Sequence, residues 1–209
     1  MEIAYLGHSS FKIIGKDLSV VSDPFDGGKV GIEMPRVSAD VVTISHDHFD
    51  HNNKASVKGD FVCFDTPGEY EIKGAEITGI ESDHDASGGA ERGKNTIFVY
   101  QIDGIHVCHL GDLGCGLSSE QLEKMDGIDI LLIPVGGKVT IDAKAAAKVI
   151  SEIEPKIVIP MHFRVGKMTE LDTLDKFIDA IGKTPKKTDR LKVQKKDLPE
   201  EMEVVVLKA

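Results

Sequence analysis

The chain of 209 residues is 41% hydrophobic, which is enough for one well-buried core, so we expect a single domain over residues 1–209. A formal net charge of −10 argues against a nucleic-acid partner, because a phosphate backbone is bound by clustered lysine and arginine. No apolar run is long enough to span a membrane, no signal-peptide pattern begins the chain, and the three cysteines show no paired spacing, so we expect a reduced, cytoplasmic protein.

The first hundred residues are predicted to consist mostly of strands joined by turns. Gly15-Lys16-Asp17 and Asp103-Gly104 each separate two β-rich runs and predict hairpins. The polar, glycine-rich segment 81–95 predicts a mobile loop. The predicted strands cover residues 2–6, 10–14, 18–22, 41–44, 61–64, 75–80, 97–102 and 105–109.

The second half alternates between strands and helices. Residues 118–125 open with a Ser-x-x-Gln capping box, and the alanine-rich segment 143–154 stops before Pro155, so both are predicted helices. A Thr-x-x-Asp start and helical apolar spacing predict a third helix over Thr169–Ile181. Predicted strands at 130–134, 157–160 and 203–207 complete a mixed α/β (α+β) pattern.

Directly after the apolar run 41–44 come three histidines and an aspartate within six positions: His46, His48, Asp50 and His51. Side chains two apart on an extended chain point the same way, so His46 and His48 can hold one ion, and a turn brings Asp50 and His51 toward a second position. Imidazole and carboxylate together suit zinc, manganese or iron. The alternative is a histidine-rich surface loop with no ligand.

Further candidate ligands follow other predicted strands. His84 comes after the strand at 75–80, Asp112 after the strand at 105–109, and His162 after the strand at 157–160. Loops at strand ends carry much of the chemistry in sheet-based folds, so we expect these three side chains to complete the site.

In this order, Asp23-Pro24, His46-x-His48-x-Asp50-His51, His84, Gly111-Asp112 and His162 resemble the metallo-β-lactamase superfamily. Flanking segments such as Ile133-Pro134-Val135-Gly136-Gly137 resemble its small, single-domain hydrolases, which include the ascorbate-6-phosphate lactonases. The resemblance covers nearly the whole chain. It implies a four-layer αβ/βα sandwich in which each half of the chain contributes one β-sheet.

The resemblance also implies two metal positions. His46, His48 and His84 would hold one ion, Asp50, His51 and His162 a second, and Asp112 would bridge both. The sequence His84-Asp85-Ala86-Ser87-Gly88 departs from the His-Ser context of many relatives, which makes His84 the weakest match.

Two further residues are candidates for roles beside the metals. Asp23 would accept a hydrogen bond from a ligand imidazole, or it would simply form an Asp-Pro turn. The family places His8 near the mouth of the cleft, which suits contact with substrate or proton transfer, although a structural histidine at a strand end is the alternative.

We therefore expect a hydrolase that uses two divalent ions, zinc first and manganese or iron as alternatives. A metal-bridging hydroxide, with Asp50 and Asp112 as catalytic residues, would attack a small ester, lactone or phosphoester. One alternative is a nuclease or phosphodiesterase of the same superfamily. Another is a non-hydrolytic di-iron or metal-sensing protein, although di-iron relatives typically have glutamate at the position of His48. The expected partners are a small-molecule substrate and a second copy of the chain.

Overall fold

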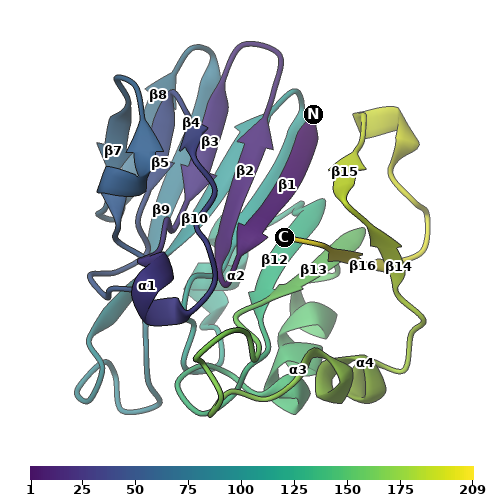
Figure 1. Cartoon of the computed structure of the whole chain (residues 1–209). Coiled ribbons are helices and arrows are strands. Elements are labelled where there is room, and N and C mark those ends of the chain that lie inside the picture. The colour runs from purple at the N-terminus through teal and green to yellow at the C-terminus, as the bar shows by residue number, and fades with distance from the viewer.

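The apolar runs assemble into two β-sheets in the computed structural model, which describes all residues 1–209 (Figure 1). The first sheet contains, in spatial order, β15 (Arg190–Lys192), β1 (Glu2–Gly7), β2 (Ser10–Ile14), β3 (Ser19–Ser22), β5 (Val41–Thr43) and β7 (Val62–Phe64). The second contains β14 (Lys186–Thr188), β16 (Glu203–Leu207), β13 (Ile157–Met161), β12 (Ile130–Pro134), β11 (Ile105–His109), β10 (Lys94–Ile102), β9 (Ala75–Asp83) and β8 (Gly68–Ile72).

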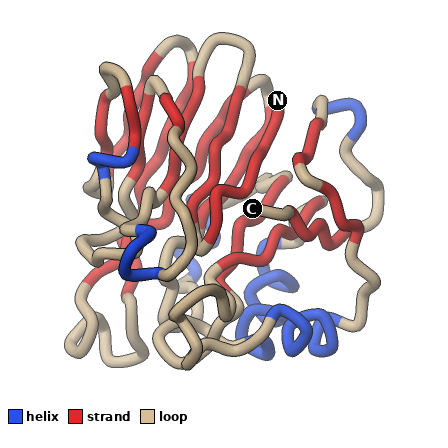
Figure 2. The backbone as a smooth tube through the Cα atoms, viewed as in Figure 1, coloured by secondary structure: helices blue, strands red, loops and turns tan.

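Helices lie outside the two sheets, and most of them cover the second sheet (Figure 2). The helices α2 (Ser119–Lys124), α3 (Ala143–Ile153) and α4 (Leu174–Ile181) pack there. The outer layer of the first sheet is thin. It comprises α1 (Gly27–Val30), the 3-10 turn η1 (Lys54–Ser56) and a ladder of β4 (Val37–Ser38) with β6 (Val57–Lys58). A second 3-10 turn, η2 (Lys195–Asp197), precedes β16. The predicted four-layer αβ/βα arrangement is confirmed.

Alternation along the strands separates the core into layers. Val20 and Val41 point into the 22-residue core between the sheets, whereas their neighbours Val21 and Val42 point into a smaller cluster on the outer face of the first sheet. On the second sheet, Leu131 faces the helices. Tyr100 lies fully buried between the sheets, and its hydroxyl group lies 2.6 Å from Thr43 Oγ1, so a hydrogen bond ties the end of β5 to the second sheet.

The division of the chain between the sheets differs from the expectation. Strands β8, β9 and β10 from the first half join the second sheet, and β15 from the C-terminal part returns to the edge of the first. The first sheet therefore takes its main strands from residues 2–64. The strands β8, β14 and β15 were not predicted, because each is short and lies at or next to a sheet edge, where polar and charged residues are tolerated.

The helix predicted to begin at Thr169 begins at Leu174 instead. Asp172 cannot start a helix, because its N–H donates to the Gly136 carbonyl (2.7 Å) and its carbonyl accepts from the Arg164 N–H (2.9 Å). These bonds hold residues 164–172 as a loop against β12 and β13. None of the helices combines the length and the apolar character needed to cross a membrane, and all three cysteines are free thiols.

The directions of the strands place the predicted ligand residues at one edge of the sandwich. In the first sheet, β1 and β3 both run antiparallel to β2, and β5 runs parallel to β3. In the second sheet, β11, β12 and β13 are parallel, and β9 and β11 both run antiparallel to β10. The carboxyl ends of these seven strands therefore meet at the same edge of the sandwich, where the predicted ligands follow them.

Candidate metal centre

The loops at this common edge bring the seven predicted ligands together. One group, here called the first group, contains His46, His48 and His84, with ligand atoms within 4.8 Å of one another. The second group contains Asp50, His51 and His162, and His8 joins it at the same separation. His46 and His51 also form a set with Asp112, which lies between the two groups.

The Asp112 carboxylate is the centre of the cluster. Its Oδ1 atom lies 3.2 Å from His51 Nε2, and its Oδ2 atom lies 3.1 Å from His162 Nε2 and 3.4 Å from His84 Nε2. His46 Nε2 is 3.9 Å from the same Oδ2 atom. Burial alone would raise the pKa of Asp112, but His162 and His51 outweigh it and hold this pKa well below its usual range. Asp112 is therefore a carboxylate that faces imidazoles of both groups.

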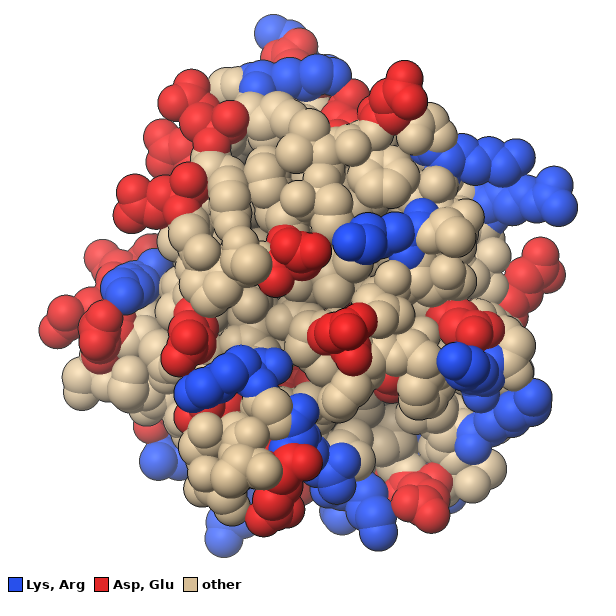
Figure 3. Space-filling model, turned by 90° about the vertical axis from the view of Figure 1, so that its left-hand side faces the viewer, with Lys and Arg blue, Asp and Glu red and all other residues tan.

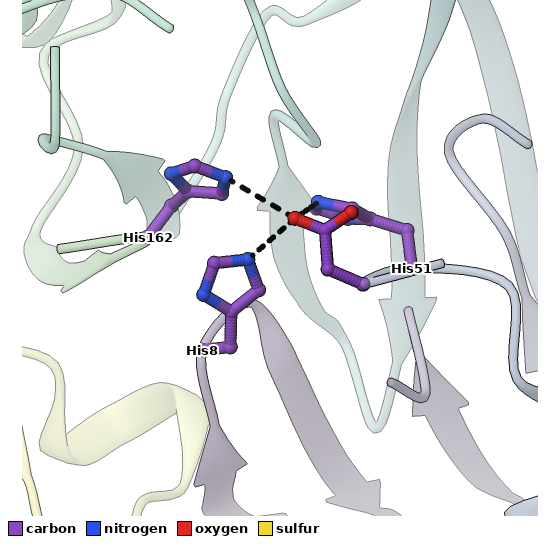
Figure 4. A group of neighbouring side chains, drawn as sticks. His8, His51 and His162 are labelled. Carbon is purple, nitrogen blue, oxygen red and sulfur yellow. Dashed lines mark hydrogen bonds and ion pairs between the residues drawn. The ribbon is translucent and has the colours of Figure 1, made fainter. Parts of the chain in front are cut away.

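The second group is buried, and its three imidazoles surround the carboxylate of Asp50. Figure 4 shows His8, His51 and His162 converging on one carboxylate oxygen. This atom is Asp50 Oδ2, which lies 3.0 Å from His8 Nε2, 3.6 Å from His51 Nε2 and 4.0 Å from His162 Nε2. All three imidazoles are fully buried, and Asp50 is 7% exposed.

Asp23 holds His51 in place from the side away from the cluster. The His51 Nδ1 atom donates to Asp23 Oδ2 at 2.7 Å, which leaves Nε2 directed at Asp112. The backbone N–H and the hydroxyl group of Ser45 also donate to the Asp23 carboxylate, at 2.8 and 2.6 Å. Burial lowers the pKa of His51, but Asp112 and Asp23 together raise it well above its usual value. Asp23 therefore lies where a residue that orients a ligand imidazole would lie.

The first group is more open to solvent. His48 is exposed, and its ring centroid lies 4.5 Å from that of His46 and 5.1 Å from that of His84. His46 Nδ1 donates to Ser45 Oγ at 2.9 Å, because the Ser45 hydroxyl proton is donated to Asp23. Burial lowers the pKa of His46 to about 3, so its imidazole is neutral at neutral pH and keeps a lone pair for a ligand.

Buried atoms without partners indicate what the cluster binds. His46 Nε2, His51 Nε2, His162 Nε2 and Asp112 Oδ1 are all buried and make no hydrogen bond. His51 and His162 still face Asp112 at ion-pair distance, but buried donors and acceptors that crowd one point without hydrogen-bond geometry indicate that something binds them together. Nitrogen and carboxylate donors are the ligands of zinc and related divalent ions. The residues therefore fit a metal ion, and the His/Asp cluster is able to bind one.

The expected place of His8 was wrong. The side chain lies fully buried beneath Asp50 rather than at the mouth of the cleft. The carbonyl of His8 accepts from the Tyr5 hydroxyl group (2.8 Å) and from the His162 N–H (2.9 Å), so this residue connects the second group to β1. Burial is the main cause that lowers the pKa of His8 to about 4.

Backbone conformation marks the same region. His8, Asp23 and His162 adopt left-handed φ angles of 53°, 43° and 51°. Such a conformation costs a non-glycine residue on the order of 1–3 kcal/mol and persists where the surrounding structure requires it. In each case it turns the chain sharply at a strand end, which directs the side chain into the cluster.

Two buried residues that sequence reasoning left without a role support Asp112. Asn95 Oδ1 accepts from the Asp112 N–H (2.9 Å), while its amide group donates to the Leu110 carbonyl (2.9 Å). His109 Nδ1 accepts from the Gly111 N–H (3.1 Å), and its Nε2 donates to the Ser9 carbonyl (2.8 Å). Burial lowers the pKa of His109, which agrees with a neutral ring. The place of His109 at the end of a predicted strand was its only signal in the sequence, and Asn95 had none.

Asp85 organises the loop that carries His84. The predicted loop 81–95 is shorter than expected, since β9 runs to Asp83 and β10 begins at Lys94. The Asp85 carboxylate accepts four backbone N–H bonds, from Ser87, Gly89, Glu91 and Arg92, at 2.7–3.0 Å. A side chain that satisfies four amides replaces regular structure here, and the mobility predicted for the loop stays a prediction.

Glycines allow two ligand loops to approach their neighbours. A Cβ atom on Gly114 would collide with the backbone of His84, and one on Gly136 would collide with the His162 carbonyl. Larger residues at these positions would push His84 and His162 away from Asp112. The requirement for glycine thus follows from close backbone contact.

Comparisons with known proteins agree with this geometry. The family model of the β-lactamase superfamily domain matches residues 2–162. A solved structure from Thermotoga maritima, described as a candidate zinc-dependent hydrolase of the metallo-β-lactamase superfamily, is 37% identical with a TM-score of 0.84, over 99% of this chain and 97% of that one.

Two curated relatives are called UPF0173 metal-dependent hydrolases. The protein from Carboxydothermus hydrogenoformans is 29% identical over 82% of this chain and 88% of its own length. The protein from Thermococcus onnurineus is 28% identical over 78% of this chain and 84% of its own. None of these names specifies a substrate, so the resemblance to ascorbate-6-phosphate lactonases stays a prediction. Sequence, fold and site together establish that this chain belongs to the metallo-β-lactamase superfamily.

Proposed function

We propose that the protein is a metal-dependent hydrolase with two divalent ions, zinc first and manganese or iron as alternatives, which acts on a small ester, lactone or phosphoester. One observation carries the proposal: unpartnered buried atoms of His46, His51, His162 and Asp112 face one another at the strand ends. The names of the relatives, metal-dependent hydrolases, support the same reaction class.

In this proposal the first group would hold one ion, Asp50, His51 and His162 would hold the other, and Asp112, which lies between the two groups, would contribute to both. When bound, the ions would lower the pKa of a coordinated water molecule and polarise the substrate oxygen. Asp23 keeps the proton of His51 on Nδ1, so that Nε2 remains a ligand. His8 Nε2 can donate to Asp50, which fixes the direction of that carboxylate beside the reacting atoms.

Surface charge supports a small substrate over a nucleic acid. On the face shown in Figure 3, acidic and basic side chains are interspersed among uncharged ones. A nuclease needs a continuous basic surface to follow a phosphate backbone, and the net charge of −10 opposes one. The cytoplasmic location and the association of two copies of the chain stay predictions from the sequence.

The proposal is tested by metal analysis and generic hydrolysis. Protein purified without chelator, or reconstituted with zinc, should contain close to two equivalents of transition metal. It should hydrolyse p-nitrophenyl acetate or bis(p-nitrophenyl) phosphate, and a chelator should abolish this turnover. Less than one equivalent after reconstitution, or turnover that survives complete metal removal, would contradict the proposal.

A further inference from the structure

A cavity of about 470 Å³ opens beside the first group. His46 forms part of its wall, and the Nε2 atom of the same ring lies 3.9 Å from Asp112. The cavity therefore borders a residue of the first group. The volume falls in the range of small-molecule sites. The other lining residues are Ile44, Asp47, Asn52, Lys54, Asp65 and Thr66.

The lining of this cavity is unusually polar for a small-molecule site. Ile44 is its only hydrophobic residue, whereas most ligand pockets are predominantly apolar. The carboxylates of Asp47 and Asp65 accept hydrogen bonds, the Lys54 ammonium group donates, and the Thr66 hydroxyl group does both. An apolar ligand would displace water from these groups without replacing its hydrogen bonds, which is unfavourable. Hydroxyl groups can pair with both kinds of partner.

Charge in the cavity disfavours an anionic ligand. Its two carboxylates outnumber its single ammonium group. The Lys54 Nζ atom lies 3.5 Å from Asp65 Oδ2, so its charge is already compensated. Both side chains of this pair are about half exposed, at 48% and 51%, so water weakens the attraction but does not reverse the sign of the local charge. A phosphate or carboxylate group would meet excess negative charge here.

We propose that this cavity binds the uncharged, hydroxyl-rich part of the substrate while the bond to be cleaved lies at the cluster. This inference rests on the hydrolytic function proposed above and narrows its substrate class. The substrate would be an ester, lactone or phosphoester that carries several hydroxyl groups and no further anionic group on the side that enters the cavity.

The test measures binding directly, by two-dimensional NMR of the zinc-loaded, ¹⁵N-labelled protein. Three probes of similar ring size are titrated: methyl α-glucoside, its 6-sulfate, and cyclohexanol. Methyl α-glucoside should shift the amide signals of Asn52, Lys54 and Thr66, with a Kd about tenfold lower than that of either other probe. Equal dissociation constants, or shifts confined to other parts of the protein, would overturn the inference.

A charge variant separates the cavity from general electrostatics. Asp65→Asn keeps the shape of the side chain but leaves the Lys54 charge uncompensated. It should reduce the preference for methyl α-glucoside over its 6-sulfate from about tenfold to about threefold or less. Asp60→Asn is the matched control, because Asp60 is exposed and lies outside the cavity lining. An unchanged ratio in Asp65→Asn, or the same fall in both variants, would overturn the inference.

These outcomes are independent of the proposed function. Turnover of p-nitrophenyl acetate and bis(p-nitrophenyl) phosphate is measured on the same zinc-loaded sample. Loss of binding selectivity with retained metal-dependent turnover contradicts the cavity assignment alone. Selective binding without any turnover contradicts the hydrolytic function and leaves the cavity as a site for hydroxylated ligands.

Discussion

The two groups of the metal centre use the same side-chain chemistry but are supported in different ways. In the second group, His51 and His162 are fully buried, His51 donates a hydrogen bond to Asp23, and Asp50 accepts one from His8. In the first group, His48 is exposed and makes no hydrogen bond through its ring. The support of His84 comes from a loop rather than from a second side chain on its ring.

This difference teaches that ligand identity alone does not set affinity. Ligands that are oriented in advance lose less conformational freedom when an ion binds. We therefore expect the second group to bind its ion more tightly and the first group to lose its ion first. Three variants test this expectation. They remove the carboxylate between the two groups (Asp112), the acceptor that fixes His51 (Asp23) and the carboxylate that organises the loop of His84 (Asp85).

Asp112→Ala should have the largest effect, because Asp112 contacts imidazoles of both groups. Both ions should be lost, or bound more weakly by a factor of about a thousand, and metal-dependent turnover should disappear. Metal content is measured by mass spectrometry after gel filtration, with circular dichroism as the check on folding. A folded variant that retains two equivalents of metal would show that Asp112 does not bridge the groups.

Asp23→Ala should weaken the second group selectively. His51 would lose the acceptor that fixes its tautomer, and partners of ligand histidines typically change metal affinity by about 10–100-fold. Titration of metal-free protein with cobalt(II) should show one tight site and one weakened site. Ser45→Ala leaves the acceptor of His51 in place and should weaken the second group less, but it also removes the bond to His46 Nδ1, so its small effect should extend to the first group.

Asp85→Ala should weaken the first group by about tenfold, because the loop that carries His84 would lose four backbone hydrogen bonds to one carboxylate. The ion of the second group should be retained, so the same cobalt titration should show the opposite pattern to Asp23→Ala. Glu91→Ala is the control in the same loop, since the Glu91 carboxylate accepts only from Ser87. If Asp85→Ala and Glu91→Ala behave alike, the loop does not support His84.

These contrasts also show what could be predicted from the sequence. Most of the long strands, and the candidate ligands that the fold brings together, were predictable, because apolar runs of strand length are followed by histidine or aspartate. The residues that support these side chains through hydrogen bonds were not predictable. Asn95, His109 and Asp85 act through hydrogen bonds whose partners depend on how loops meet in space. In the sequence, His8 has the pattern of an ordinary histidine at a strand end, and only the fold shows that it is fully buried.

Errors in the fold have a related cause. The helix expected from Thr169 was plausible by local pattern, but Gly136, distant in the sequence, and Arg164, eight residues earlier, hold the backbone groups of Asp172. Likewise, β14 and β15 consist mainly of polar and charged residues, and they form strands because each pairs with a strand already in place.

The smallest effect concerns the stability of the metal-free protein, with changes of roughly 1 kcal/mol per pH unit. Burial lowers the pKa of His8 to about 4 and of His46 to about 3. Below pH 6.5 the unfolded chain binds protons that these folded imidazoles do not, so the free energy of unfolding should fall as the pH falls from 6.5 toward 4. The pKa of His51 is raised, and its stabilisation is therefore lost as the pH rises above 6.5.

Urea unfolding of chelator-treated protein should consequently show maximal stability near pH 6–7 and a decline on either side. His8→Gln, which lies in the second group, and His46→Gln, which lies in the first, should each flatten the acid side of this profile and leave the alkaline side in place. A profile that rises steadily toward pH 4 would mean that the buried imidazoles are protonated in the folded protein. The variant that flattens the acid side more identifies the group whose burial contributes more to the pH dependence of stability.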